Sequence, residues 1–299
     1  MSVTAETVRV LRERTGAGMM ECKKALVETN GDLDAAAELM RKSGMAKADK
    51  KATRVAAEGK VVVEVSADGH AAAIVEVNCE TDFVAREADF SAFATAVAQV
   101  ALMARPDTLE SLLAAKLASG ETVDERRRAL VAKLGENVSV RRSAILASQG
   151  PLGAYLHGTR IGVLVALEGG DATLARDIAM HVAASNPAYL AAADVPAEAV
   201  AKERAIRVDM LKNDEKNKNK PENILVKIVE GGMGKWYGEI TLQGQPFVKD
   251  PDQTVGKLLE SARAKVSNFI RFEVGAGIEK KKEDFAAEVM AQVSAAARS

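Results

Sequence analysis

Residues 61–78, with the sequence VVVEVSADGHAAAIVEVN, are the stretch that decides the fold. Every second position from 61 to 65 is a valine, and this period of two is typical of a β-strand with one buried face. The Asp-Gly pair at 68–69 favours a tight turn, so we expect residues 71–78 to return as the partner strand. Phenylalanines and valines at helical spacing between 90 and 100 then predict a helix packed on this hairpin.

The second half of the chain repeats this arrangement. Strands are predicted over 152–156 and 160–167, around a turn at 157–159. Asp171 then caps a predicted helix, which Asn186 ends. Because a hairpin followed by a packed helix occurs twice, we expect an α+β fold. Its core would be two related α+β subdomains packed together and not one doubly wound sheet.

The first 44 residues carry the pattern of three short helices. Thr4 is a predicted cap of the first helix, and Gly44 is predicted to end the third. Residues 45–60 are basic and poor in apolar side chains, which indicates a linker helix or tether; binding of phosphate groups is the alternative. We therefore place a three-helix N-terminal domain and its linker at 1–55.

A charged helical hairpin is predicted in the second core subdomain. Residues 197–220 are helical in pattern and heavily charged, Pro221 interrupts them, and an apolar stripe resumes at 224–229. Two helices joined at a polar tip form an antiparallel pair. The hairpin is either an exposed element without function or an arm for docking or self-association.

The remaining boundaries follow from the periodicity after the hairpin. Strands are predicted at 239–242 and 269–274 with a helix over 255–266 between them, and a last amphipathic helix is predicted over 283–297. The resulting division is a first core subdomain at 56–140, a second at 141–276 with the hairpin inserted at about 190–230, and a C-terminal helical module at 277–299.

The composition excludes several classes of protein. The 299 residues are 47% hydrophobic and 28% charged, which is typical of a folded chain with room for about two domains. Lys plus Arg number 41 and Asp plus Glu number 42, so a dedicated nucleic-acid binder is disfavoured. No run of about 18 apolar residues and no signal peptide is found. We expect a cytoplasmic protein without membrane association, in which Cys22 and Cys79 are buried and reduced.

No catalytic or nucleotide-binding motif is found in the sequence. The Gly-Lys pairs at 59–60, 234–235 and 256–257 lack the earlier glycine and the following Ser or Thr of a phosphate-binding loop. The three histidines are far apart in sequence, unlike the clustered ligands of a zinc site. We therefore expect no enzyme, and no nucleotide, cofactor or metal bound by the chain itself.

The segment NCETDFVAREADF, at 78–90, stands out from its surroundings. A strand ends near Asn78, and Thr81 or Asp82 can cap the helix that follows. Phe83 then lies in the first turn of that helix. One interpretation is a hydrophobic staple that packs onto its own helix; the other is a side chain presented to a partner. The pattern alone favours the staple.

The chain resembles the bacterial elongation factor Ts family over essentially its whole length. The resemblance begins with TDFV at 81–84, preceded by EVNCE. The other matching stretches follow the order of the family: LRERTGAGMMECKKAL at 11–26, RKSG at 41–44, KLGENVSVRR at 133–142, HGTRIGVLV at 157–165, IAMHVAAS at 178–185, GQPFV at 244–248, FIRFEVGAGIEK at 269–280 and DFAAEV at 284–289.

This resemblance implies both a fold and a function. The implied fold has an N-terminal three-helix domain like ubiquitin-associated domains, two α+β core subdomains, an inserted coiled-coil hairpin and a C-terminal helical module. The implied function is guanine nucleotide exchange on elongation factor Tu, with GDP release so that GTP can bind. Such a factor binds the GTPase and not the nucleotide. The alternatives are a ubiquitin-associated-type adaptor without exchange activity and an enzyme acting on a small molecule.

The resemblance also implies roles for particular residues. Phe83 would enter an apolar pocket near the switch region of the GTPase and displace its Mg²⁺, with Asp82 capping the helix that aims it and Thr81 and Val84 fixing the loop. Further partner contacts are implied in the N-terminal domain and in the second subdomain: Arg12, Met19, Met20 and His157. If the charged hairpin is an arm for self-association, as its pattern allows, the chain would form a homodimer through it.

Overall fold

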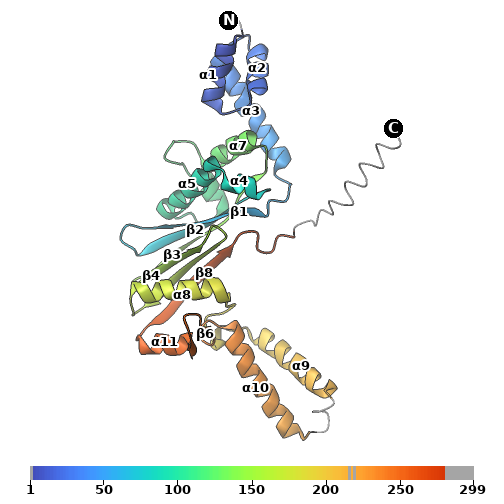
Figure 1. Ribbon diagram of the computed structural model, residues 1–299, viewed down its shortest axis with the longest axis vertical. Coiled ribbons are helices and arrows are strands. Elements are labelled where there is room, and N and C mark those ends of the chain that lie inside the picture. The colour runs from blue at the N-terminus through green and yellow to red at the C-terminus, as the bar shows by residue number, and fades with distance from the viewer. Residues whose placement is uncertain (1–2, 215–216, 218–219, 280–299) are drawn as a thin grey trace, which may run out of the picture.

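Two three-stranded antiparallel sheets pack face to face at the centre of the molecule (Figure 1). The computed structural model describes residues 3–214, 217 and 220–279. The first sheet has the order β1 (Glu58–Val65), β2 (Ala71–Cys79) and β3 (Val138–Ala147), and the second β4 (Leu152–His157), β5 (Ile161–Glu168) and β8 (Lys265–Glu273). The contact between them is built from buried side chains of both sheets and of the residue just after β8: Val61, Ala72, Ile74, Leu146, Leu164, Ala166, Phe272 and Val274.

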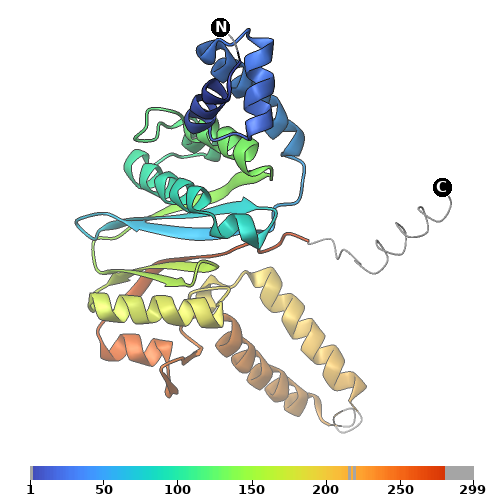
Figure 2. The same ribbon diagram turned by 45° about the horizontal axis from the view of Figure 1, so that its top comes forward.

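Helices cover the outer faces of both sheets, which gives four layers (Figures 1 and 2). The first sheet carries α4 (Asp82–Arg86), α5 (Ala88–Ala104), α6 (Leu109–Ala114) and α7 (Val123–Leu134), and the second carries α8 (Ala172–Ser185) and α11 (Val255–Ser261). Phe90 and Ile178 are fully buried beneath them. The predicted hairpins at 61–78 and 152–167 and the α+β class are confirmed.

Three helices precede the sheets and have a small core of their own: α1 (Ala5–Thr15), α2 (Met19–Glu28) and α3 (Leu33–Lys51). The prediction that Gly44 ends the third helix is wrong, because α3 continues to Lys51. A Cβ atom at Gly44 would lie 3.1 Å from the Cβ of Ala132 on α7. The glycine therefore allows α3 and α7 to approach closely, which is a packing requirement and not a helix end.

The predicted hairpin is formed by α9 (Ala197–Asn213) and α10 (Glu222–Ile240), which project away from the sheets (Figures 1 and 2). Arg204 and Glu230 join the two helices by an ion pair of 3.2 Å. The strand predicted at 239–242 is wrong: α10 continues to Ile240, and Thr241 forms only an isolated bridge with Tyr189. A short 3₁₀ helix (Ala192–Asp194) precedes α9.

The helix predicted over 255–266 is shorter in the structure. The chain passes from α10 through β6 (Pro246–Phe247) and β7 (Asp250–Thr254) into α11, which ends at Ser261. Arg263 adopts a φ of 50°, in the left-handed region, and this turns the chain into β8 at Lys265. The predicted helix at 283–297 lies outside the described residues.

A buried carboxylate ties the two sheets together. Glu76 of β2 is completely buried and accepts hydrogen bonds from Arg141 Nη1 at 3.0 Å and Arg142 Nε at 2.6 Å, both on β3. It also accepts one from the Gly275 N–H at 2.8 Å, just after β8. Arg141 donates in turn to the carbonyl of Ala276, after β8, and Arg142 donates to the carbonyl of Glu273, the last residue of β8. The described chain beyond β8 is therefore fastened to the first sheet.

Candidate partner-binding site

The segment after β2 forms a short helix that projects one aromatic side chain. Thr81 is the N-cap of α4, since its Oγ1 accepts a hydrogen bond from the Val84 N–H at 3.4 Å. The implied capping role of Asp82 is wrong. Asp82 is the first helical residue, and its carboxylate pairs with Arg86 at 2.6 Å. The cap of α4 is thus a threonine, whereas Asp171 caps α8 as predicted.

Phe83 is presented to solvent and not packed on its own helix. Its side chain is 76% exposed, while the next two residues, Val84 and Ala85, are buried against the core. With Thr81 as the cap, a hydrophobic staple would join positions 80 and 85, which are glutamate and alanine. The staple interpretation of Phe83 is therefore wrong. Val84 and Ala85 pack the helix against the core, and the Phe83 ring lies on its solvent-exposed side.

His157 ends β4, and the turn that follows it, at 158–160, lies at the same edge of the molecule as the Phe83 helix. Glu58 opens β1 and pairs in register with Cys79, two residues before Thr81. The same Glu58 forms an ion pair with Arg160 at 2.8 Å. The carbonyl of Thr159 accepts a hydrogen bond from the β1 residue Val61 at 2.8 Å. The turn from 158 to 160 is therefore fastened to the first sheet beside the end of β2.

His157 itself is exposed at the end of β4, where the sequence had predicted a turn. Its Nδ1 lies 3.4 Å from the hydroxyl of Tyr155, and the two rings are 6.4 Å apart. His157 comes from the second sheet and Phe83 from a helix on the first, so the packing of the two sheets brings these two sequence-predicted residues to one side.

The other sequence-predicted residues belong to the three N-terminal helices, beyond α7 in Figure 1. Arg12 on α1 is exposed, and so are Met19 and Met20 at the start of α2, Met20 being 77% exposed. The structure thus divides the predicted residues into two exposed groups on the molecule: Phe83 with His157, and Arg12 with the two methionines.

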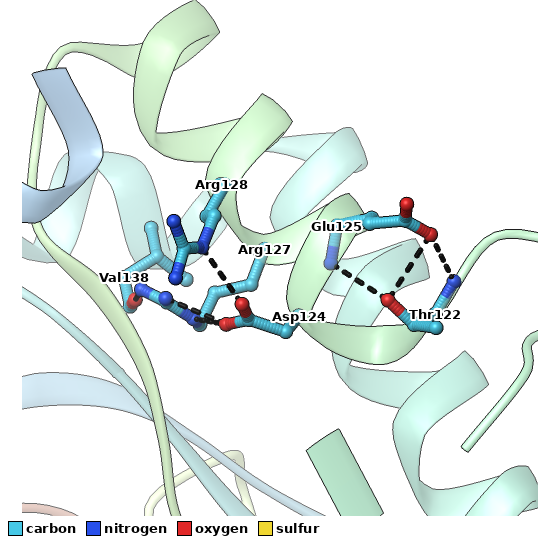
Figure 3. A network of polar contacts seen from close by, with 6 residues as sticks. All are labelled: Thr122, Asp124, Glu125, Arg127, Arg128 and Val138. Atoms are coloured by element: carbon cyan, nitrogen blue, oxygen red, sulfur yellow. Dashed lines mark hydrogen bonds and ion pairs between the residues drawn. The ribbon is translucent and has the colours of Figure 1, made fainter. Parts of the chain in front are cut away.

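Helix α7 joins these two parts of the molecule. Thr122 and Glu125 cap the first turn of this helix reciprocally (Figure 3). Glu125 Oε2 accepts a hydrogen bond from the Thr122 N–H at 2.9 Å and another from the Thr122 Oγ1 at 3.1 Å. Asp124 holds Arg127 and Arg128, and Arg127 donates to the carbonyl of Val138 on β3 at 3.2 Å. These bonds fix α7 to the first sheet on one side, while α3 packs on its other side.

The charge on Asp124 is maintained by those arginines. Burial raises the pKa of the Asp124 carboxyl, but the hydrogen bonds and charges of Arg127 and Arg128 outweigh burial and hold the pKa below its usual value. A cavity of about 640 Å³ lies between α7 and the three N-terminal helices and is lined by both, including Met40 of α3 and Ala132 of α7.

The remaining groups that could carry chemistry have structural partners. His181 is buried, with Nε2 at 3.0 Å from Gln245 Oε1 and Nδ1 accepting from the Val248 N–H at 3.2 Å. Burial lowers the pKa of His181 despite the Gln245 contact. Within the described residues, no three His, Cys, Asp or Glu side chains gather as metal ligands would, and no helix has the length and apolar character to cross a membrane.

Both cysteines are buried and unpaired, as predicted. Burial is the main cause that raises the pKa of the Cys79 thiol to about 12, and the charges of Glu136 and Glu58 add to it. The thiol donates to the Thr81 carbonyl at 3.2 Å.

We expect Cys79 to resist alkylation in the folded protein. At pH 8 the thiolate is scarce because the pKa is about 12, and the side chain is out of reach of reagents. Mass spectrometry after treatment with iodoacetamide, with and without urea, measures this. Modification of Cys79 in the native protein as fast as in urea would contradict the prediction.

Sequence reasoning did not single out Glu136. This residue follows α7, and its carboxylate accepts from both the N–H and the Oγ1 of Thr81, at 3.0 and 2.7 Å. The only sequence signal is its place in KLGENVSVRR, one of the stretches that carried the family resemblance.

Comparisons with known proteins agree with that resemblance. The family model described as "Elongation factor TS" matches residues 80–276. The chain is 62% identical to the elongation factor Ts of Methylococcus capsulatus, covering 99% of this chain and 100% of the relative. It is 57% identical to that of Alkalilimnicola ehrlichii, covering 98% and 99%, and 59% identical to that of Thioalkalivibrio sulfidiphilus, covering 99% and 100%.

Proposed function

The chain belongs to the elongation factor Ts family, and we propose that it acts on its partner through the exposed Phe83. Members of this family are nucleotide exchange factors for elongation factor Tu in translation elongation; they are not enzymes. Translation takes place in the cytoplasm, which agrees with the location expected from the sequence. The observation that carries the proposal is the 76% exposure of Phe83 between a capped helix start and two buried neighbours.

Exchange sets an energetic requirement on this surface. The factor must bind the nucleotide-free GTPase more tightly than the GDP form, so that factor and GDP are negatively coupled. Each tenfold loss of GDP affinity requires about 1.4 kcal/mol of differential binding. An aromatic side chain that is exposed in the free factor and buried in the complex is the type of residue that supplies such energy.

We propose that Phe83 enters an apolar pocket near the switch region of the GTPase and displaces the Mg²⁺ that bridges protein and GDP. Thr81 sets the start of the helix, and Val84 anchors it to the core. Asp82 is exposed beside Phe83 and is available to contact the partner together with Arg86, its ion-pair partner. Release of labelled GDP from elongation factor Tu, on mixing with the purified chain, tests exchange directly.

Further partner contacts are proposed at Arg12, Met19, Met20 and His157. The exposure of these four side chains supports the proposal. Met side chains are flexible and polarizable and adapt to irregular surfaces. The location of His157 at the same edge of the molecule as the Phe83 helix supports a shared contact with the partner.

We expect the double substitution of Met19 and Met20 by serine to weaken binding to nucleotide-free elongation factor Tu by about tenfold, or ~1.4 kcal/mol. Two exposed apolar side chains lose the area that they would bury in the complex. Met103→Ser is the matched control, since Met103 is 74% exposed on α5 outside the proposed contacts. Calorimetric titration measures the affinities. Equal affinities of the double variant and the wild type would remove these methionines from the interface.

The domain division stays part of the proposal: 1–55, 56–140, 141–276 with the hairpin at about 190–230, and 277–299. So do the likeness of the first three helices to ubiquitin-associated domains, the kinship of the two core subdomains and the coiled-coil character of the hairpin. Exposed Ile206 and Met210 on α9 support the further proposal of a homodimer through the hairpin.

The adaptor without exchange activity is the alternative function. It depends on the three-helix domain, whereas the family model matches residues 80–276, outside these helices. Family membership therefore favours exchange.

A further inference from the structure

We propose that Glu136 is a positioning residue for nucleotide exchange, because its carboxylate fixes Thr81 and thereby the helix that presents Phe83. The proposal rests on the proposed role of Phe83. Glu136 Oε2 accepts from the Thr81 N–H at 3.0 Å, and Glu136 Oε1 accepts from the Thr81 Oγ1 at 2.7 Å. The two oxygens of this carboxylate thus accept hydrogen bonds from the backbone and from the side chain of the same residue.

The hydroxyl of Thr81 is oriented by this contact. A hydroxyl has a single hydrogen, and at Thr81 this hydrogen is donated to Glu136. The lone pairs of Oγ1 are then left to accept the Val84 N–H, which is the capping bond of α4. Glu136 therefore determines in which direction the cap of the Phe83 helix points.

The helix needs an external anchor because it is very short. The five residues of α4, Asp82–Arg86, are far below the length at which a helix is stable by itself. Phe83 is the second of them, one turn or less from Thr81. A shift of Thr81 therefore moves the exposed ring directly, whereas the buried Val84 and Ala85 hold only the inner side of the helix.

Glu136 is itself held in a fixed loop. Residues 135–137 connect α7 to β3, and the N–H of Asn137 donates to Glu80 Oε1 at 2.6 Å. The side-chain amide of Asn137 donates to the carbonyl of Arg54 at 2.8 Å. The loop therefore bonds to the two consecutive residues before α4, Glu80 and Thr81, and to the segment that leads from α3.

The chain contains a matched control for this contact. Glu125 on α7 accepts from the N–H and Oγ1 of Thr122, as Glu136 does from Thr81 (Figure 3). The Thr122 pair caps α7 and presents no exposed aromatic side chain. Substituting Glu125 removes bonds of the same kind without touching the Phe83 helix.

The experiment compares Glu136→Ala, Glu136→Gln and Glu125→Ala in the full chain, each with Phe83 intact and with Phe83→Ala. Release of labelled GDP from elongation factor Tu is followed over a range of factor concentrations, with thermal unfolding of each variant alongside. We expect Glu136→Ala to lower the maximal release rate by about tenfold, through misplacement of the ring. The concentration for half-maximal release should change less than about twofold, since Glu136 acts through Phe83.

The variants separate positioning from a general structural role. Glu136→Gln keeps one carbonyl oxygen as an acceptor, so we expect an intermediate rate. Glu125→Ala should release GDP at the wild-type rate. In the Phe83→Ala background, Glu136→Ala should lower the maximal rate of GDP release by less than about a further twofold, because the side chain that Glu136 positions is gone.

Each opposite result overturns the inference. If Glu136→Ala releases GDP at the wild-type rate, Glu136 does not position Phe83. The same follows if Glu136→Ala slows release by as large a factor in the Phe83→Ala background as it does with Phe83 intact. A loss for Glu125→Ala as large as for Glu136→Ala would assign both to stability. If Glu136→Ala is unfolded at the assay temperature, Glu136→Gln takes its place in the test, and a wild-type release rate for folded Glu136→Gln would overturn the inference. A wild-type rate for Phe83→Ala alone would remove the proposed function as well, whereas a slow Phe83→Ala beside a normal Glu136→Ala would remove only this inference.

Discussion

Replacing Phe83 with alanine slows GDP release from elongation factor Tu by at least about tenfold and leaves the factor's melting temperature nearly unchanged. The ring is 76% exposed, so its removal creates no cavity in the folded factor. A tenfold slower rate corresponds to ~1.4 kcal/mol in the barrier, well within the contribution of a buried aromatic anchor at an interface. Stopped-flow release of a fluorescent GDP analogue and thermal unfolding measure the two quantities.

The buried Phe93 on α5 provides the contrast. Phe93→Ala should cost about 3–5 kcal/mol of folding stability, since this side chain is enclosed in the core between the first sheet and its helices. Exchange by the folded fraction should then be preserved. A melting temperature of Phe83→Ala lowered as far as that of Phe93→Ala, with exchange intact in the cold, would contradict the proposal for Phe83.

Chelation of Mg²⁺ separates two ways in which Phe83 could act. If the ring works by displacing the metal of the GTPase, the deficit of Phe83→Ala shrinks when the metal has already been removed by chelator. A deficit of equal size with and without chelator would argue against the displacement of Mg²⁺ and leave Phe83 as a binding anchor.

Replacing Glu76 with alanine lowers the free energy of unfolding by about 3 kcal/mol, the second large effect expected. The substitution leaves Arg141 and Arg142 without their buried carboxylate, and the Gly275 N–H without an acceptor. It also loosens the tie between the first sheet and the chain beyond β8. Urea denaturation measures the loss, and Glu168→Ala, at an exposed position at the end of β5, is the control. If Glu76→Ala lowers the free energy of unfolding by less than about 1 kcal/mol, Glu76 does not hold the two sheets together as described.

The same carboxylate predicts a pH dependence of stability. Burial raises the pKa of Glu76, but the Gly275 hydrogen bond and the two arginines outweigh burial and hold the pKa below its usual value. Because the pKa of Glu76 is lower in the folded than in the unfolded state, its ionised carboxylate stabilises the fold at every pH above the unfolded pKa, which is near 4.5. This stabilisation is lost as the pH falls through the folded pKa. The difference in stability between wild type and Glu76→Gln should therefore narrow from pH 7 toward pH 3; a constant difference would contradict it.

Local patterns in the sequence were sufficient for much of the fold. The period of two around Asp68-Gly69 determined the first hairpin, and the spacing after Asp171 determined α8 with its cap. These elements depend on neighbours within a few positions of one another, which is the range that periodicity and capping rules describe. Motif resemblance, spread over the whole chain, supplied the family.

Other elements depended on contacts that no local pattern contains. Gly44 is a helix end by local rules, yet α3 continues past it because α7 packs against that point. Residues 239–240 carry a strand pattern, yet they complete α10. In both cases packing and the hydrogen bonds of a long helix outweigh a weak local preference.

The sequence by itself determined the family, the order of most elements and the candidate Phe83. Only the tertiary structure decided that Phe83 is exposed and that Thr81, not Asp82, starts its helix. It also brought Glu136 to Thr81 across 55 positions of the chain. Exposure and long-range hydrogen bonds are properties of the folded arrangement, because each depends on which distant segments pack beside a residue, and the spacing of residues along one strand or helix carries no record of those neighbours.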